Sequence, residues 1–318
     1  LESTRAVLFA LIHVVVYCHL SLGQSSSKSN FAFSFAGYNR QSKTFLCSPG
    51  GNIKGMIATA LGEDDPLEIP TTNKNKPHVQ CDANDPVMGN VVKFTIYKDD
   101  NDSTEKKPGE KKDRQRMEMK GKKAGNKGDT FLYAWWFKLD PNMRNTNLFY
   151  HIFQIKTGGS EKLTKFALAT LTLTNKDQLH LQLNNLNAEG KPSPKFSLEI
   201  NQVKGKWIQA FVEAAYKKGS EGGYIRVTMK DENGKLLKDS TKIKHDMWWD
   251  NKSYPFRPKW GLYRKISPAY QPSDWQKFQN VQIWKKNSSY NTCAHTFYKW
   301  CMVSVSNDWG YKGLRFKG

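Results

Sequence analysis

The stretch RPKWGLYRKI, residues 257–266, has four cations in ten residues and reads as a β-strand rather than a helix. Side chains along a strand point alternately to its two faces. One face of this strand is polar and carries Arg257, Lys259, Gly261 and Tyr263. The other face is apolar and carries Trp260 and Leu262. Such a strand is either a solvated edge or part of a surface that holds an anion.

Segments with strand-like alternation, separated by Gly or Asn turns, recur through the middle of the chain. They span residues 90–98, 130–139, 147–156, 165–174, 178–186, 195–200, 206–217, 223–231 and 278–286. Residues 206–217 contain the helix formers Ala and Glu, but their position between two strand-like runs favours a strand. Residues 31–85 are rich in turn residues, which predicts loops and short strands. The pattern predicts an all-β antiparallel sandwich rather than alternating β and α units.

The chain has 318 residues, with 49 Lys and Arg against 29 Asp and Glu, a formal net charge of +20. This excess predicts an anionic partner, and nucleic acid, acidic membrane and acidic polysaccharide all qualify by charge. The cellular compartment decides among these three classes.

Residues 1–23 have the layout of a secretory signal peptide. Arg5 precedes an apolar run from Ala6 to about Leu20, and small residues follow. A membrane anchor is the alternative, but the run is shorter than the ~20 residues that span a bilayer. We therefore expect a secreted, extracellular protein. An acidic glycan is then a better candidate partner than nucleic acid.

Four cysteines would remain after removal of residues 1–23, namely Cys47, Cys81, Cys293 and Cys301. An even number in a secreted chain predicts two disulfides, and proximity in sequence favours Cys47–Cys81 and Cys293–Cys301 among three pairings. A zinc site is disfavoured because there is no C-x-x-C spacing. Residues 287–318 are therefore expected to form a disulfide-pinned tail. The N-x-S/T sequons predict glycosylation at Asn101, Asn251 and Asn287.

Two further strands resemble residues 257–266 in having one polar face. In DRQRMEMK (113–120), one face carries Arg114, Arg116 and Glu118, and the other carries Met117 and Met119. In LFYHIFQIK (148–156), strict alternation groups Tyr150, Gln154 and Lys156 on one face and His151, Phe153 and Ile155 on the other. A solvated outer face would explain any one of these strands. Three strands that combine Arg, Gln, Lys and Tyr predict a concave cationic cleft.

Five blocks resemble, in order, the consecutive blocks of polysaccharide lyase family 20, the glucuronan lyases, within the jelly-roll alginate and heparin lyase type. The blocks are DRQRMEM, GDTFLYAWWFKL, FYHIFQIK, GKWIQAFVEAAYKKGSEGGYIRV and RPKWGLYRKI. The resemblance extends from about Val91 to Lys286, whereas residues 24–90 match poorly. It implies a concanavalin-like β-jelly roll over residues 24–286 and β-elimination on a 1,4-linked polyuronate.

β-Elimination needs a neutralised uronate carboxylate, a base for the C5 proton and an acid for the departing O4. The resemblance implies Tyr263, in a K-x-G-x-Y block, as general acid/base and Gln154 as the carboxylate neutraliser. Lys156 stands where alginate lyases have the His of a Gln-Ile-His block. Arg116 of an R-x-E block would bind the substrate carboxylate, with Glu118 as its orienting partner.

A tyrosine needs nearby cations to act as a base, and Lys259 and Arg257 are the local candidates. The residues expected to bind substrate are Lys259, Lys156, Arg114, Tyr150, Arg257 and Glu118. His151 titrates near neutrality and lies in a matching block, but alternation points it away from Gln154. A β-bulge would bring the two together, and without one His151 would belong to the core.

We expect a monomer that acts on an acidic polysaccharide, requires no cofactor, binds no nucleic acid and does not span a membrane. A structural Ca²⁺ is an option, because residues 62–66 and 98–102 are acidic, although neither stretch has an EF-hand spacing. The alternative function is a lectin-like or matrix protein that binds acidic polysaccharide without cleaving it, since sandwich folds host many functions.

Overall fold

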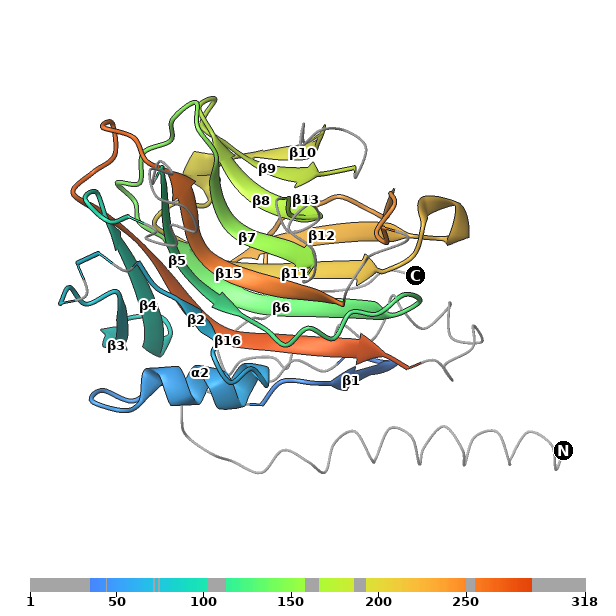
Figure 1. Cartoon of the computed structure of the whole chain (residues 1–318), viewed down its shortest axis with the longest axis horizontal. Helices are drawn as coiled ribbons and strands as arrows, with labels where there is room; N and C mark the ends of the chain where they lie inside the picture. The colour runs from blue at the N-terminus through green and yellow to red at the C-terminus, as the bar shows by residue number, and fades with distance from the viewer. Residues whose placement is uncertain are drawn as a thin grey trace, which may run out of the picture. The chain divides into compact units, whose positions relative to one another are not determined.

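The computed structural model describes residues 35–43, 45–70, 72–73, 75–101, 113–157, 166–185, 193–249 and 255–287. Within these residues the chain forms an all-β sandwich of the jelly-roll type, built from two antiparallel sheets (Figure 1). The predicted fold class is therefore confirmed. The described helices are all too short or too polar to cross a bilayer.

The first sheet, called the seven-stranded sheet, carries the three polar-faced strands side by side. Its strands in spatial order are β10 (Ser193–Glu199), β9 (Gln178–Leu183), β8 (Ala169–Thr174), β7 (Tyr150–Thr157), β15 (Phe256–Lys265), β5 (Arg114–Lys120) and β2 (Leu67–Glu68). Strands β7 and β8 curve along their length (Figure 1). Segments far apart in sequence, such as β5 and β15, are thus neighbours.

The second sheet, called the nine-stranded sheet, covers one face of the first. Its strands in order are β13 (Leu236–Asp239), β12 (Tyr224–Asp231), β11 (Trp207–Ala215), β6 (Thr130–Leu139), β16 (Ser273–Lys286), β4 (Gly89–Tyr97) and β3 (Val79–Asp85), with β1 (Tyr38–Arg40) on β16 and β14 (Ile243–Lys244) on β12. Two short 3₁₀ turns, η1 (Ile200–Gln202) and η2 (Gly219–Glu221), lie between strands. Strand β11 confirms that residues 206–217 favour a strand over a helix.

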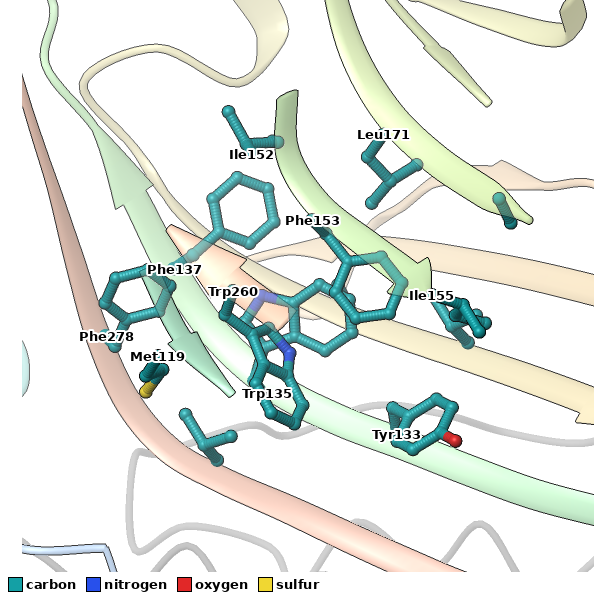
Figure 2. Close-up of a cluster of buried hydrophobic side chains, with 14 of the residues drawn as sticks. Met119, Tyr133, Trp135, Phe137, Ile152, Phe153, Ile155, Leu171, Trp260 and Phe278 are labelled. Carbon is teal, nitrogen blue, oxygen red and sulfur yellow. The ribbon is translucent and has the colours of Figure 1, made fainter. Parts of the chain in front are cut away.

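The core between the sheets is rich in aromatic side chains (Figure 2). Trp135 on β6 stacks on Phe153 of β7, with ring centroids 4.8 Å apart. Trp260 on β15 meets Trp135 edge-on at 6.2 Å. Each buried aromatic contributes roughly 1.5–3 kcal/mol through burial, and each ring pair adds about 0.5–1.5 kcal/mol. This packing determines which face of β7 and β15 points inward.

A buried ion pair also joins the two sheets. Arg264 on β15 donates to Asp274 at the start of β16, and neither side chain is exposed. Arg264 also donates from Nε to Gln115 Oε1 at 2.7 Å, and its guanidinium lies 3.8 Å from the ring centroid of Tyr270. The charge of Arg264 is thus compensated inside the core, as a buried charge requires.

The turn-rich N-terminal part contains the helix α2 (Ile53–Leu61), so the expectation of loops and short strands alone was wrong. Asn52 caps its start by accepting a hydrogen bond from the Gly55 backbone N–H at 2.8 Å. Gly62 ends it in the left-handed conformation, with φ 66°. Residues that read as turns are therefore the two caps of a short helix whose Leu61 packs into the core.

Cys47 and Cys81 form a disulfide with their Cα atoms 5.7 Å apart, the pairing that proximity favours. The chain between them includes α2 and β2. Several predictions lie outside the described residues, namely the signal peptide (1–23), Asn251, the disulfide of Cys293 with Cys301 and residues 288–318 of the tail. Glycosylation of Asn101 and Asn287 stays a prediction.

Candidate active site

The polar faces of three strands form one surface, because β5, β15 and β7 are adjacent in the seven-stranded sheet. The antiparallel pairing sets Lys259 opposite Gln154. It also sets Tyr263 between Arg116 on β5 and His151 on β7. Met117, Phe153 and Trp260 pack into the core, so the polar side chains point away from the nine-stranded sheet.

His151 lies on the same face as Gln154 because β7 contains a β-bulge. His151 pairs with Thr172 of β8, whereas Phe153 pairs with Leu171, so Ile152 is an extra residue. The strict alternation predicted for β7 is therefore wrong before Phe153. The bulge that would reconcile His151 with Gln154 is present, and the His151 ring lies 5.8 Å from the Tyr263 ring.

The same bulge turns Tyr150 into the core, which corrects its expected role in substrate binding. Tyr150 is fully buried, and its hydroxyl accepts a hydrogen bond from Arg264 Nη1 at 3.4 Å. Its ring meets that of Tyr270 edge-on. Tyr150 therefore belongs to the interior network of Arg264 and does not reach the site surface.

Gly261 allows β15 to pass close to β5 beside Tyr263. Its φ of 136° lies outside the range of ordinary side chains, and a Cβ there would stand 2.2 Å from the Met117 carbonyl oxygen. The pairing of β15 with β7 shifts between Trp260 and Tyr263. This shift aligns Tyr263 with His151.

Tyr263 is surrounded by arginines and aromatic rings. Arg114 Nη1 donates to the Tyr263 hydroxyl oxygen at 2.9 Å. The Arg116 guanidinium lies 4.3 Å from the centroid of the Tyr263 ring, and Phe149 lies 5.1 Å away. The cations next to Tyr263 are therefore Arg114 and Arg116 rather than the predicted Lys259 and Arg257.

Gln154 and Glu118 form the buried centre of the surface, 2 % and 1 % exposed. Gln154 Nε2 donates to Glu118 Oε1 at 2.5 Å. Glu118 Oε2 lies 3.6 Å from Arg116 Nε, which places the predicted orienting partner beside this arginine. Burial raises the pKa of Glu118, although Lys259 and Arg116 act to lower it.

Glu68 on β2 also belongs to this surface, although no sequence pattern predicted it. Its carboxylate accepts hydrogen bonds from Lys259 Nζ at 2.7 and 2.8 Å and from Arg116 Nη1 at 2.8 Å. Burial alone would raise the pKa of Glu68, but Lys259 and Arg116 outweigh it and hold the pKa far below its usual range. Because β2 has only two residues, no alternation pattern could predict this position. Glu63, which lies 3.4 Å from Arg257, is outside any strand and was not predicted either.

A pocket of about 280 Å³ opens beside these residues. It is lined by Glu68, Arg116, Lys120, Lys123, Lys156, Thr157, Arg257 and Lys259. Burial, followed by the charges of Lys259 and Arg116, lowers the pKa of Lys156 to about 8, and the charges of Glu118 and Glu68 oppose this only in part. Within the described part of the chain, Lys156 has no acidic partner in ion-pair range.

His151 is neutral at neutral pH. Burial, followed by the charges of Lys156 and Arg114, lowers its pKa to about 3. Its Nδ1 is 2.7 Å from the Thr172 hydroxyl oxygen, which fixes the plane of the ring. His151 therefore presents an uncharged imidazole next to Tyr263.

One acid of each stretch considered for Ca²⁺ forms an exposed ion pair. Asp65 pairs with Lys54 at 3.0 Å, and Asp99 pairs with Lys76 at 2.8 Å. Among the described residues, no group of three or more His, Cys, Asp or Glu side chains is placed to hold a metal ion.

The chain matches a family model described as "Polysaccharide lyase" over residues 52–295. A search of curated proteins finds no match. Three similar solved structures are an endo-β-1,4-glucuronan lyase from the fungus Trichoderma reesei, the family 7 alginate lyase A1-II′ in complex with substrate, and a GH131 β-glucanase catalytic domain from Podospora anserina.

The identities are 14 %, 15 % and 14 % in the same order, and the TM-scores are 0.47, 0.49 and 0.45. The matches cover 64 %, 70 % and 69 % of this chain and 85 %, 92 % and 84 % of the other chains. Lyases and a glucanase match at similar scores, so these similarities do not identify the reaction.

Proposed function

Because the chain belongs to the polysaccharide lyase family, we propose that it cleaves a 1,4-linked acidic polyuronate, such as glucuronan, by β-elimination. The observation that carries this proposal is the juxtaposition of Tyr263 with a basic pocket on one face of three adjacent strands. Within that pocket, Lys156 lacks an acidic partner among the described residues and is available to a ligand carboxylate.

The substrate carboxylate is bound by Lys156 and by the Gln154 amide in this proposal. Lys156 and Gln154 point to the same side of β7, two residues apart. Arg116 and Lys259 already share Glu68, whereas Lys156 has no carboxylate in ion-pair range among the described residues. A bound carboxylate would compensate the charge of Lys156 and would itself be neutralised, which makes the C5 proton more acidic.

Tyr263 is proposed to move the proton. Its oxygen accepts a hydrogen bond from Arg114 Nη1, and Tyr263 acts in its phenolate form in this proposal. The phenolate takes the proton from C5, the C5 electron pair forms the C4=C5 double bond, and the C4–O4 bond breaks. The phenol then gives the same proton to O4, so that the enzyme returns to its starting state.

His151 is proposed to contact the same sugar as an uncharged group. Its imidazole faces Tyr263, and its low pKa keeps it uncharged at neutral pH, so that it can exchange hydrogen bonds with the sugar. The pH profile of wild-type activity is therefore expected to show no acidic limb between pH 5 and 7. Substitution of His151 by Ala is expected to lower activity and to leave the profile in that range unchanged. A limb in that range in the wild-type enzyme would contradict the neutral role.

The experiment is an absorbance assay for the unsaturated uronate product on a panel of glucuronan, alginate and other polyuronates. The wild-type protein is expected to form product, and the Tyr263→Phe variant to form none while still binding the polymer. Tyr224→Phe is the matched control, because it removes a hydroxyl that donates to Glu213 on the other sheet. Binding without product across the panel would instead support the lectin-like alternative.

Secretion and independence from cofactors are parts of the same proposal. The Cys47–Cys81 disulfide supports an extracellular location, because disulfides persist in oxidising compartments. Neutralisation, base and acid are each assigned to side chains above, so activity is expected to survive treatment with EDTA. Loss of activity that added Ca²⁺ restores would contradict this part.

A further inference from the structure

Glu68 lies in the pocket but reaches neither Tyr263 nor Gln154 directly. Its carboxylate is bound by Lys259 on β15 and by Arg116 on β5, so one acidic side chain joins two strands. Its backbone is held as well, because Leu67 and Glu68 pair with Met119 and Glu118 of β5. Leu67 is 8 % exposed and belongs to the core. The backbone of Glu68 is therefore held in place against β5.

The two cations that Glu68 holds each contact a different part of the proposed reaction centre. Arg116 extends its guanidinium over the ring of Tyr263 at 4.3 Å. Lys259 Nζ lies 3.9 Å from Glu118 Oε2, and Glu118 accepts the hydrogen bond from Gln154. The position of Glu68 thus bears on both the proton-transfer residue and the carboxylate-binding amide.

We infer that Glu68 is a positioning residue, which holds Arg116 over Tyr263 and Lys259 beside the Glu118–Gln154 pair. The inference rests on the proposed function. Arg116, Lys259 and Lys156 are like charges that face one pocket, and Glu68 reduces the repulsion among them at shorter range than Glu118 does. Long basic side chains also have many rotamers. A carboxylate that binds Arg116 and Lys259 restricts these rotamers in advance, so the two side chains lose less conformational entropy when substrate binds.

A carboxylate in this place has a rival explanation with the opposite consequence. Glu68 could act as a built-in competitor that a substrate carboxylate must displace from Lys259 and Arg116. Removal of a competitor lowers KM and leaves kcat unchanged or higher. Removal of a positioning residue lowers kcat with little change in KM. The two explanations therefore separate in steady-state kinetics.

The test compares Glu68→Gln, which removes the charge, with Glu68→Asp, which keeps the charge but shortens the side chain. Asp64→Asn is the matched control, because Asp64 is an exposed acid of the same segment. We expect Glu68→Gln to lower kcat by roughly tenfold to a hundredfold, with KM changed less than about threefold. Glu68→Asp should lower kcat by a smaller factor, and Asp64→Asn should leave both constants unchanged.

The pH profile separates positioning from a loss of folded protein. The charged groups that face Lys156 are Glu68 on β2, Arg116, Glu118 and Lys120 on β5, Arg257 and Lys259 on β15, and Lys123. Glu68 favours the charged form of Lys156, so Glu68→Gln should move the alkaline limb of kcat/KM to lower pH by roughly half a unit or more. Glu68→Asp keeps the charge and should leave the limb in place.

A crystal structure of the Glu68→Gln variant tests the inference without any substrate. The Arg116 guanidinium is expected to leave its place over the Tyr263 ring. An unmoved Arg116 and Lys259, a lowered KM at full kcat, or wild-type kcat in both Glu68 variants would each overturn the positioning role. A wild-type protein that is inactive on every polyuronate would contradict only the proposed function. The crystal structure of the Glu68→Gln variant would still show whether Arg116 has moved, because that observation does not depend on turnover.

Discussion

Lys156→Met is expected to make the protein more stable at neutral pH while it removes polyuronate binding. Burial and neighbouring cations lower the pKa of Lys156 from its ordinary 10.5 to about 8. A folded-state pKa below the unfolded value means that the charged form is destabilised in the folded protein. Methionine has a similar length and carries no charge, so it avoids this penalty.

The expected gain in the free energy of unfolding follows from the pKa shift of Lys156. The difference of about 2.5 units between the two pKa values corresponds to a destabilisation of about 3 kcal/mol. Residual exposure of the Lys156 side chain reduces this destabilisation to about 1–3 kcal/mol. The penalty is fully present below pH 8. It is relieved as the pH rises from 8 towards 10.5, because the folded protein loses the proton first. Lys156→Met should therefore raise the Tm by roughly 2–12 °C at pH 7 and by about half of that rise or less at pH 9.5.

The assay is thermal unfolding of wild type and variant at pH 7 and pH 9.5, together with glucuronan binding at pH 7. Lys123→Met is the control, because Lys123 lines the same pocket but is exposed. It should change the free energy of unfolding by less than about 0.5 kcal/mol. A Lys156→Met variant less stable than wild type at pH 7, or a gain that does not depend on pH, would refute the reasoning. Undiminished polyuronate binding by this variant would refute its role as the carboxylate partner.

Three further outcomes are expected. Gln154→Ala should lower kcat/KM by roughly 10²-fold in the polyuronate assay, since it removes a preorganised amide donor; a change in KM alone would argue against that role. Replacement of Cys47 and Cys81 by Ser should lower the free energy of unfolding by about 4 kcal/mol, because the disulfide closes a long loop with a sequence separation of 34. Urea titration measures this loss, and an unchanged unfolding midpoint would contradict it. Gly261→Ala should lower both Tm and activity, because the new Cβ would meet a β5 carbonyl oxygen at 2.2 Å; a wild-type Tm would exclude that strain.

The strands could be read from the sequence because alternation is a local property. Each strand predicted between residues 90 and 286 is present, including β11, where helix propensity competed with context. Alternation also assigned the two faces of β5 and β15 correctly, since Met117 and Trp260 are buried in the core. The helix α2 was missed because its caps, Asn52 and Gly62, are the same residue types that form turns.

The candidate site was predictable only where the strands are regular. The bulge at Ile152 reverses the alternation of β7, and it brings His151 into the site and sends Tyr150 to Arg264. A bulge is one extra residue whose place is set by the pairing of neighbouring strands, so no periodic pattern reveals it. The ion pair of Arg264 with Asp274 was equally hidden, because charged residues are usually exposed.

The amino-acid sequence by itself determined the β-sandwich, the inward faces of its regular strands and the chemistry available to the site. These follow from side-chain period and residue type, which are local. Only the tertiary structure decided which charges meet. It brings Glu68 from a two-residue strand to Lys259, 191 positions later, and leaves Lys156 unpaired among the described residues. Electrostatic energy depends on distance in space and on burial, and neither quantity can be read along the chain.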